Sequence, residues 1–260
     1  MRPSEWGTVE SFYRRTLEAL VRAGEPFLVG GGWALRTQAG VVRDSHDLDL
    51  FVRSQDLRRI AAALEDAGEH VEVVFKHWLA KIWDGHRYVD VIFNSGNAVA
   101  KVDDEWFAHA IDSSLFGIPV KLCPPEETIW SKSFVMERER CDVADVLHVL
   151  LAHADTLDWS RLLRRFGAHF RVLFAHLVLF GYVYPSEARR VPRWVMDELA
   201  GRLRDEGEQP IERVCCGTLL SREQYLVDVE EWGFRDGRLP PHGRMRPSEI
   251  EAWTAAITEK

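Results

Sequence analysis

The sequence predicts an α/β (α+β) protein whose first part mixes short strands with helices and whose second part is helical. Two observations support this fold class. Up to residue 95, short apolar runs rich in β-branched residues alternate with amphipathic segments and glycine-containing turns. From residue 124 onward, apolar residues recur at roughly helical spacing over long stretches. In this chain of 260 residues we therefore expect one domain at residues 1–120 and an α-helical domain at residues 121–260.

The first predicted elements are a helix, a strand and a second helix. Residues 9–23 have an amphipathic pattern that predicts a helix, and the apolar run 27–29 predicts a short strand. Three consecutive glycines follow at residues 30–32, and the next helix is expected to begin at Trp33. The glycines therefore lie between a strand and a helix.

Four more strands and one helix are expected before residue 95. Residues 47–52 alternate carboxylates with apolar side chains, which indicates a strand, and Ser54 is expected to cap the helix that follows. Asp84-Gly85 is a hairpin signal between two apolar runs. The remaining predicted strands are residues 71–75, 79–83 and 88–93.

The composition excludes several classes of protein. The net charge is −8 and the pI is near 5.7, so no overall positive field would hold long DNA or RNA. The four cysteines show neither a C-x-x-C pair nor the spacing of a zinc site, which favours reduced thiols. The N-terminal residues lack a signal-peptide pattern, and the most apolar stretch, residues 172–180, is too short to span a bilayer. We therefore expect a cytoplasmic protein without a membrane partner.

Three aspartates have unusual positions in the predicted strands. Asp47 and Asp49 are two residues apart, so their side chains leave one face with Cα atoms roughly 6.5 Å apart. Asp90 is the only charged residue among residues 88–93. Carboxylates on largely apolar strands repel one another unless a cation, a shared proton or an exposed edge relieves the repulsion. The three together predict an oxygen-rich site suited to Mg²⁺, with Mn²⁺ as an alternative.

The glycine turn predicts a phosphate site beside these carboxylates. Without Cβ atoms, Gly31 and Gly32 allow backbone N–H groups at the start of the following helix to approach phosphate oxygens. The positive end of the helix dipole also favours an anion there.

The glycines, a spacer and Asp47-Leu48-Asp49 resemble the first motif of the DNA polymerase beta-like nucleotidyltransferase superfamily, although the spacer is slightly long. Asp90 matches the third carboxylate of that superfamily. Arg43 and Ser45 resemble the approach to the strand in many small bacterial nucleotidyltransferases, and more loosely Lys132 resembles part of their basic helix.

The resemblance implies a fold with a small mixed β-sheet flanked by helices, residues 1–120 being the catalytic domain, followed by the helical domain. It implies transfer of a nucleoside monophosphate from a nucleoside triphosphate to a hydroxyl, with release of pyrophosphate. Asp47 and Asp49 would hold the metal that carries the triphosphate, and Asp90 would join a second metal and orient or deprotonate the acceptor. Gly31, Gly32, Arg43, Ser45 and Lys132 would bind the nucleotide.

The acceptor stays open between a small molecule, an RNA end and a protein hydroxyl. A cationic drug would require an acidic pocket, for which residues 103–105 are candidates, whereas tRNA would require a basic patch. Arg161, Arg164, Arg165 and Arg171 are the candidates for that patch.

Other interpretations of the same residues also stay open. The three aspartates could be a solvated strand edge or a calcium site, and the glycines a simple turn. A non-catalytic nucleotide-binding or regulatory module and a metal-dependent phosphohydrolase are the alternative functions.

Overall fold

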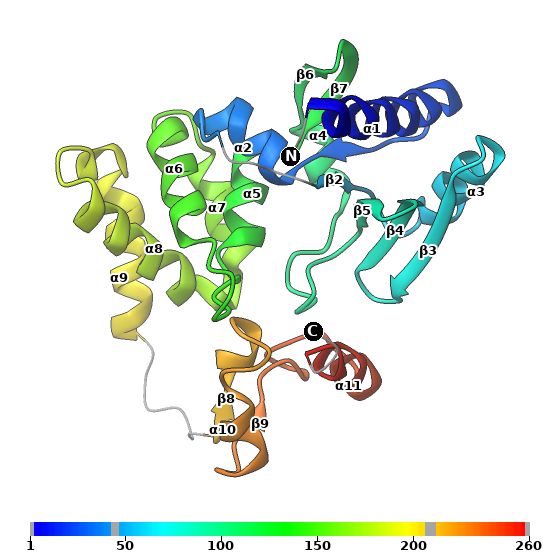
Figure 1. Ribbon diagram of the computed structural model, residues 1–260. Helices are drawn as coiled ribbons and strands as arrows, with labels where there is room; N and C mark the ends of the chain where they lie inside the picture. The colour runs from blue at the N-terminus through cyan, green and yellow to red at the C-terminus, as the bar shows by residue number, and fades with distance from the viewer. Residues whose placement is uncertain (1–2, 43–46, 206–211, 258–260) are drawn as a thin grey trace. The chain divides into compact units, whose positions relative to one another are not determined.

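The computed structural model describes residues 3–42, 47–205 and 212–257, with the side chains of residues 3–8 left out (Figure 1). The chain forms two compact units. Unit 1 comprises Met1–Gly96 and Lys101–Pro124, and unit 2 comprises Asn97–Ala100 and Pro125–Lys260. The boundary that we predicted at residue 120 lies inside a strand, because residues 118–122 pair within the sheet of unit 1.

Unit 1 is built on a seven-stranded mixed sheet with strand order β3-β4-β5-β2-β1-β7-β6. The pairs β2–β5 and β1–β7 are parallel, and the other neighbours are antiparallel. This mixed sheet with flanking helices confirms the predicted fold class. The strands are β1 (Leu28–Val29), β2 (Leu48–Phe51), β3 (His70–Phe75), β4 (Leu79–Asp84), β5 (Arg87–Ile92), β6 (Ile111–Leu115) and β7 (Ile118–Leu122). The helices are α1 (Pro3–Ala23), α2 (Gly31–Ala39), α3 (Leu57–Asp66) and α4 (Asp104–Ala108).

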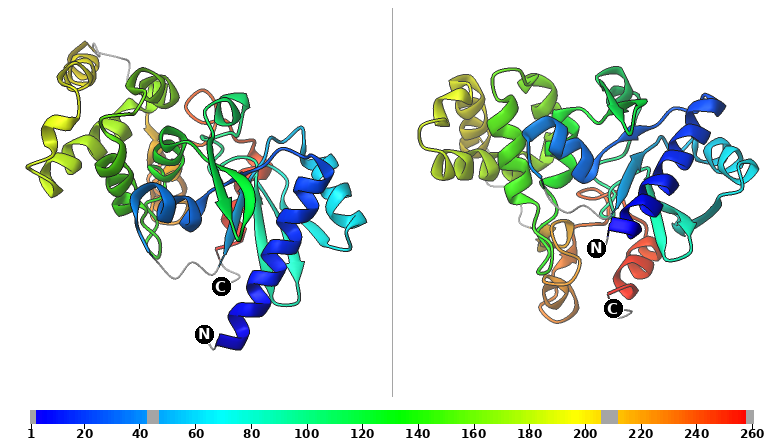
Figure 2. Two further views of the ribbon diagram at one scale, coloured as in Figure 1. Left: turned by 90° about the horizontal axis from the view of Figure 1, so that it is seen from above. Right: turned by 45° about the horizontal axis from the view of Figure 1, so that its top comes forward.

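The core of unit 1 lies where α1 and α3 pack together beside the sheet (Figure 2). Leu48 and Leu50 of β2 and Val89 and Val91 of β5 are at most 1% exposed and belong to this core. Because side chains alternate along a strand, the residues between them point to the opposite face of the sheet. The core therefore fixes the direction in which the two strands present their polar side chains.

Several local predictions for unit 1 differ from the structure. Helix α2 begins at Gly31, not at Trp33, so two of the three glycines lie in its first turn. The residue before α3 is Asp56, not Ser54. The hairpin β6–β7, with Gly117 at positive φ in its turn, was not predicted from the sequence. Its alternating polar and apolar residues are short runs that carry a weak strand signal.

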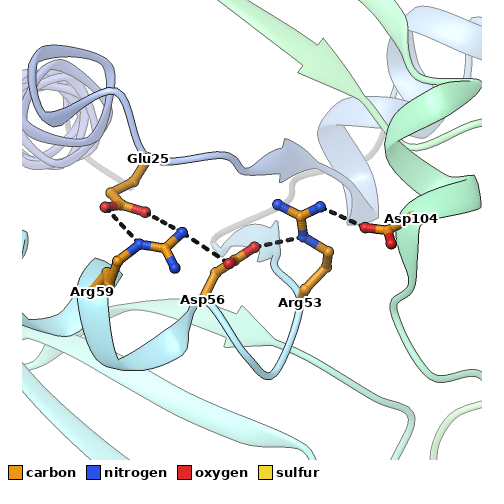
Figure 3. Close-up of polar contacts among 5 residues, drawn as sticks. All are labelled: Glu25, Arg53, Asp56, Arg59 and Asp104. Atoms are coloured by element: carbon orange, nitrogen blue, oxygen red, sulfur yellow. Dashed lines mark hydrogen bonds and ion pairs between the residues drawn. The ribbon is translucent and has the colours of Figure 1, made fainter.

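A chain of ion pairs joins three segments of unit 1 (Figure 3). The carboxylate of Asp56, 3% exposed, accepts from Arg53 Nε at 2.5 Å and from Arg59 Nη2 at 2.9 Å. Arg59 also pairs with Glu25, and Arg53 with Asp104 at the start of α4. The buried carboxylate thus links α3 to the loop before β1 and to α4.

Replacing Asp56→Asn is expected to lower the free energy of unfolding by about 2 kcal/mol, because a buried charge between two guanidinium groups is removed. The loss is smaller than for a fully buried pair, because Arg59 is 57% exposed and solvent screens its charge. Denaturant unfolding monitored by circular dichroism measures it. Asp104→Asn, at the exposed end of the same network, should change stability by less than about 0.5 kcal/mol. Equal effects of the two changes would contradict this account.

Unit 2 is mainly helical and adds a short two-stranded parallel sheet, β8 (Val214–Cys215) with β9 (Arg235–Asp236). That sheet was not predicted, because each strand has only two residues. In Figure 1 the helices α5 to α9 follow one another from green to yellow. Helix α5 packs against α6 and α7, and α8 packs against α6, α7 and α9. The main helices are α5 (Pro125–Lys132), α6 (Val143–His153), α7 (Trp159–Phe166), α8 (Phe170–Val183), α9 (Arg193–Asp205), α10 (Leu226–Glu230) and α11 (Pro247–Ala255).

The predicted basic patch is wrong for two of its four arginines. Arg161 is 3% exposed and its guanidinium pairs with Glu126 and Glu127 of α5. Arg165 Nε donates to Glu127 Oε1 at 3.0 Å and is also largely buried. Although burial raises the pKa of Glu127, both arginines act against that rise. These arginines join α7 to α5 and offer no surface to RNA.

One stretch, Trp159–Val183, is long and apolar enough by composition to cross a membrane. It consists of α7, a 3₁₀ turn at Gly167–His169, and α8, and it contains the ion-paired Arg161 and Arg165. Phe170, Leu173, Leu177 and Phe180 of α8 are buried within unit 2. Core helices of globular proteins pass the same test of composition, so the stretch is weak evidence for a membrane span.

Candidate active site

Two of the predicted carboxylates are direct neighbours in the sheet. Asp49 on β2 and Asp90 on β5 are register partners in a parallel pair, and both lie between core residues on their strands. Their side chains therefore leave the same face of the sheet, opposite the α1–α3 core. Asp47 directly precedes β2 and is half-buried. Like charges on directly opposed residues are destabilising, and a positive charge nearby would offset their repulsion.

The negative charges of the three aspartates act on common neighbours. The pKa of the Tyr88 phenol is raised, first by burial and then by the charges of Asp47, Asp90 and Asp49. Burial, followed by the charges of Asp47 and Asp49, also raises the pKa of Tyr13 on α1. A single tyrosine that responds to all three carboxylates indicates that their charges converge on one region of the sheet.

The start of α2 is in direct contact with Asp49. Gly31 has φ +55°, and a Cβ atom built there would lie 1.6 Å from Oδ2 and 2.7 Å from Cγ of Asp49. The Gly30 N–H donates to the Asp49 carbonyl at 2.9 Å, and a Cβ at Gly30 would lie 2.2 Å from the ring of Phe51. Both positions therefore require glycine, because the first turn of the helix and β2 approach too closely for a side chain.

Lys81 on β4 completes a row of charged residues across the sheet. It is the register partner of Asp90, and its Nζ lies 2.9 Å from Asp90 Oδ1 and 3.2 Å from the centroid of the Tyr88 ring. On the other side, Lys81 is opposite Glu72 of β3. The row across β2, β5, β4 and β3 therefore reads Asp49, Asp90, Lys81, Glu72.

The donor chemistry of the three aspartates fits a hard divalent cation such as Mg²⁺, because all the ligands are carboxylate oxygens. Within the described part of the chain, however, no three acidic, histidine or cysteine side chains are gathered as a ready ligand set. The ammonium of Lys81 is in contact with Asp90. A metal bound by all three aspartates would thus require a rearrangement at Asp90.

The other predicted nucleotide-binding residues fall in three places. Gly32 lies in the first turn of α2, next to Gly31. Arg43 and Ser45 lie outside the described residues. Lys132 belongs to unit 2, where its Nζ pairs with Asp142 at 2.7 Å and Asp145 at 3.0 Å. Although burial of Asp142 acts in the opposite direction, Lys132 and Arg140 lower its pKa.

The acidic residues proposed for a drug pocket have structural partners. Asp103 accepts from the backbone N–H of Glu105 and caps α4. Asp104 pairs with Arg53 in the network of Figure 3. These two carboxylates therefore stabilise the start of α4.

From the sequence alone, Lys81 is either a triphosphate contact or a residue of a solvated sheet face, and Tyr88 has no assigned role. The position of the hairpin turn determines which residues lie opposite Lys81 and Tyr88. Asp84 and Arg87 are register partners, so the two turn residues are Gly85 and His86 rather than Asp84 and Gly85. This turn places Lys81 opposite Asp90, whereas a two-residue turn of Asp84 and Gly85 would place it opposite Tyr88.

Comparison with known proteins gives one family match. Residues 13–111 match the profile of the aminoglycoside-2''-adenylyltransferase family, and this range includes Asp47, Asp49 and Asp90. No curated protein matches the chain.

Three solved structures illustrate the structural similarities. The solution structure of the antibiotic-resistance factor ANT(2'')-Ia is 22% identical, with 68% of this chain and 98% of that chain covered and a TM-score of 0.45. The lincomycin-bound lincosamide antibiotic adenylyltransferase LnuA is 17% identical, with 55% and 96% covered and a TM-score of 0.39. An antigenic nucleotidyltransferase-like protein from Paracoccidioides brasiliensis is 13% identical, with 70% and 91% covered and a TM-score of 0.42.

TM-scores below 0.5 do not establish a common arrangement of all elements. The family profile, in contrast, covers most of unit 1, including β2, β5 and the three aspartates. The match confirms the resemblance to nucleotidyltransferases over residues 13–111.

Proposed function

We propose that this protein transfers a nucleoside monophosphate from a nucleoside triphosphate to a hydroxyl of a small-molecule acceptor. The observation that carries the proposal is the placement of Asp49 and Asp90 as direct partners on one face of the sheet, with Gly31 against the Asp49 carboxylate. The family profile supports adenylyl transfer in particular, which makes ATP the first donor to test.

In the proposed reaction, the acceptor oxygen forms a bond to the α-phosphorus of the triphosphate. The bond from that phosphorus to the bridging oxygen breaks, and pyrophosphate leaves with the electron pair. Asp90 orients the acceptor hydroxyl and accepts its proton. Asp47 and Asp49 would hold the triphosphate side of the site. Asp49 lies against the first turn of α2, whose backbone N–H groups favour an anion.

Asp47, Asp49 and Asp90 would hold Mg²⁺ or Mn²⁺, which would neutralise charge on the triphosphate and on the leaving pyrophosphate. The chain itself supplies the orientation of the carboxylates. Leu48, Leu50, Val89 and Val91 anchor the two strands in the core, so that their carboxylates stay on the opposite face.

The proposed acceptor is a polyhydroxylated, amino-bearing small molecule of the aminoglycoside class, which the name of the matching family suggests. The net charge of −8 favours a cationic acceptor over a polyanion. The aspartates, together with Glu72 at the end of the charged row, would attract ammonium groups to this face of the sheet.

The test combines binding and product formation. Calorimetry should show that ATP binds in the presence of Mg²⁺ and that the double substitution Asp47→Asn, Asp49→Asn removes the metal-dependent part of the binding. With an aminoglycoside present, mass spectrometry should detect the acceptor with one added adenylyl group, and pyrophosphate should be released in equal amount.

Asp112→Asn is the matched control, because Asp112 is an aspartate on β6 of the same sheet whose side chain is 90% exposed. It should bind ATP and turn over like the unchanged protein. If the unchanged protein binds no nucleoside triphosphate, or if the double substitution binds equally well, the proposed function is wrong. Binding without transfer to any hydroxylated acceptor would support the non-catalytic alternative.

A further inference from the structure

The contact between Lys81 and Asp90 is unusual for a surface of the sheet that should bind a metal. The side chains of Lys81 and Asp90 are 16% and 20% exposed, and the ammonium and carboxylate are 2.9 Å apart. Solvent therefore screens this pair less than an open surface pair. Lys81 also lies over the ring of Tyr88 at 3.2 Å, a cation–π contact that holds the ammonium from a second side.

The same sheet contains a second cross-strand pair of lysine and aspartate, which shows what is particular about the first. Lys121 and Asp112 are register partners on β7 and β6, with 3.3 Å between Nζ and Oδ1. Their side chains are 55% and 90% exposed. An exposed pair of this kind contributes little to the stability of the fold. The pair of Lys81 and Asp90 is largely buried and lies next to another carboxylate, Asp49.

The positive charge beside Asp90 also bears on the repulsion between the opposed carboxylates. Asp49 and Asp90 face each other across the parallel pair, and their mutual repulsion opposes folding. The ammonium of Lys81 lies beside one of them and offsets part of that repulsion.

We propose that Lys81 is a built-in counter-ion of Asp90, which occupies the carboxylate in the absence of a divalent cation and must be displaced when a metal binds there. The inference rests on the proposed function, in which Asp90 is a metal ligand. Metal binding at this face then exchanges one cation for another. Lys81 thereby weakens metal affinity while it keeps the metal-free site folded.

The experiment measures binding of Mn²⁺ alone to the full chain, by the loss of the free-ion electron paramagnetic resonance signal. Lys81→Met removes the ammonium and keeps an aliphatic side chain of similar length, and it should tighten Mn²⁺ binding by about tenfold, since a neighbouring cation alters carboxylate affinity by that order. Lys81→Arg keeps the charge and should bind as the unchanged protein does. Lys121→Met, from the matched exposed pair, should also leave the affinity unchanged.

A double substitution shows whether Lys81 acts through Asp90. In the Asp90→Asn background, Lys81→Met should no longer tighten Mn²⁺ binding, because the carboxylate that the two cations share is gone. Thermal unfolding of each variant, with and without Mn²⁺, verifies that the chain is folded. The metal-free Lys81→Met variant should unfold at a lower temperature than the Lys121→Met variant.

The outcomes separate this inference from the proposed function. If Mn²⁺ binds and Asp49→Asn weakens it, but Lys81→Met has no effect or weakens it as well, the counter-ion role is wrong while the metal site stands. If tightening persists in the Asp90→Asn background, Lys81 acts elsewhere and the inference is overturned. If none of the variants binds Mn²⁺, both the inference and the metal site fail.

Discussion

Replacing Asp49→Asn should reduce kcat/KM for nucleotidyl transfer by about a thousandfold, because a metal ligand in such a site contributes on the order of 4 kcal/mol to transition-state stabilisation. Asn is nearly isosteric and keeps one oxygen, so the strand and its core contacts should be unchanged. Gly31 packs against Asp49, and Asp90 is its register partner. Asp49 therefore lies between the start of α2 and the second carboxylate of the proposed site. Steady-state kinetics with ATP and an aminoglycoside measures the loss.

The control is again Asp112→Asn on β6, which removes the same charge from an exposed position of the sheet. It should retain full activity, and both variants should have the thermal stability of the unchanged protein within a few degrees. A fall of less than about tenfold in Asp49→Asn would show that this carboxylate does not hold the metal. In that case Asp47 and Asp90 alone would have to be considered as ligands.

Gly31→Ala should reduce activity by about a hundredfold or more, with a smaller effect on stability. The added Cβ would lie 1.6 Å from Asp49 Oδ2, so the carboxylate would have to turn away from its place in the proposed site. The positive φ of Gly31 adds a backbone cost of about 1 kcal/mol for any residue with a Cβ. Kinetics at saturating ATP and denaturant unfolding measure the two effects separately.

Gly40→Ala separates the backbone cost from the contact with Asp49. Gly40 ends the same helix, has φ +65°, and a Cβ there would meet nothing within 4 Å. It should lose a similar amount of stability and keep its activity. Equal loss of activity in the two variants would mean that the helix α2 as a whole, not its contact with Asp49, determines turnover.

The fold class followed from the sequence because the first part of the chain has strong local signals. Alternation in residues 47–52 and the turn signal at Gly85 predicted β2, β4 and β5 close to their observed bounds. The hairpin β6–β7 and the short β8 and β9 could not be predicted in this way. Their strands have two to five residues, and pairing with distant segments rather than local pattern decides that they form.

The candidate site was only partly predictable, because a sequence shows which residues share a strand but not which strands are neighbours. The parallel pairing of β2 with β5, which makes Asp49 and Asp90 partners, depends on packing against the core formed with α1 and α3. The partner of Lys81 depends on the location of the hairpin turn, where an error of one residue changes every pair. The roles of Arg43, Ser45 and Lys132 in nucleotide binding stay predictions.

The order of strands in the sheet has a consequence for how the protein folds. Strands β3, β4 and β5 are joined by short connections and can pair early, since their contacts are local in sequence. Strand β2 joins β5 only after a loop that contains α3, β3 and β4 has closed. Refolding chains should therefore acquire most of their hairpin structure before the two aspartates meet, so that catalytic activity is regained in the slower phase.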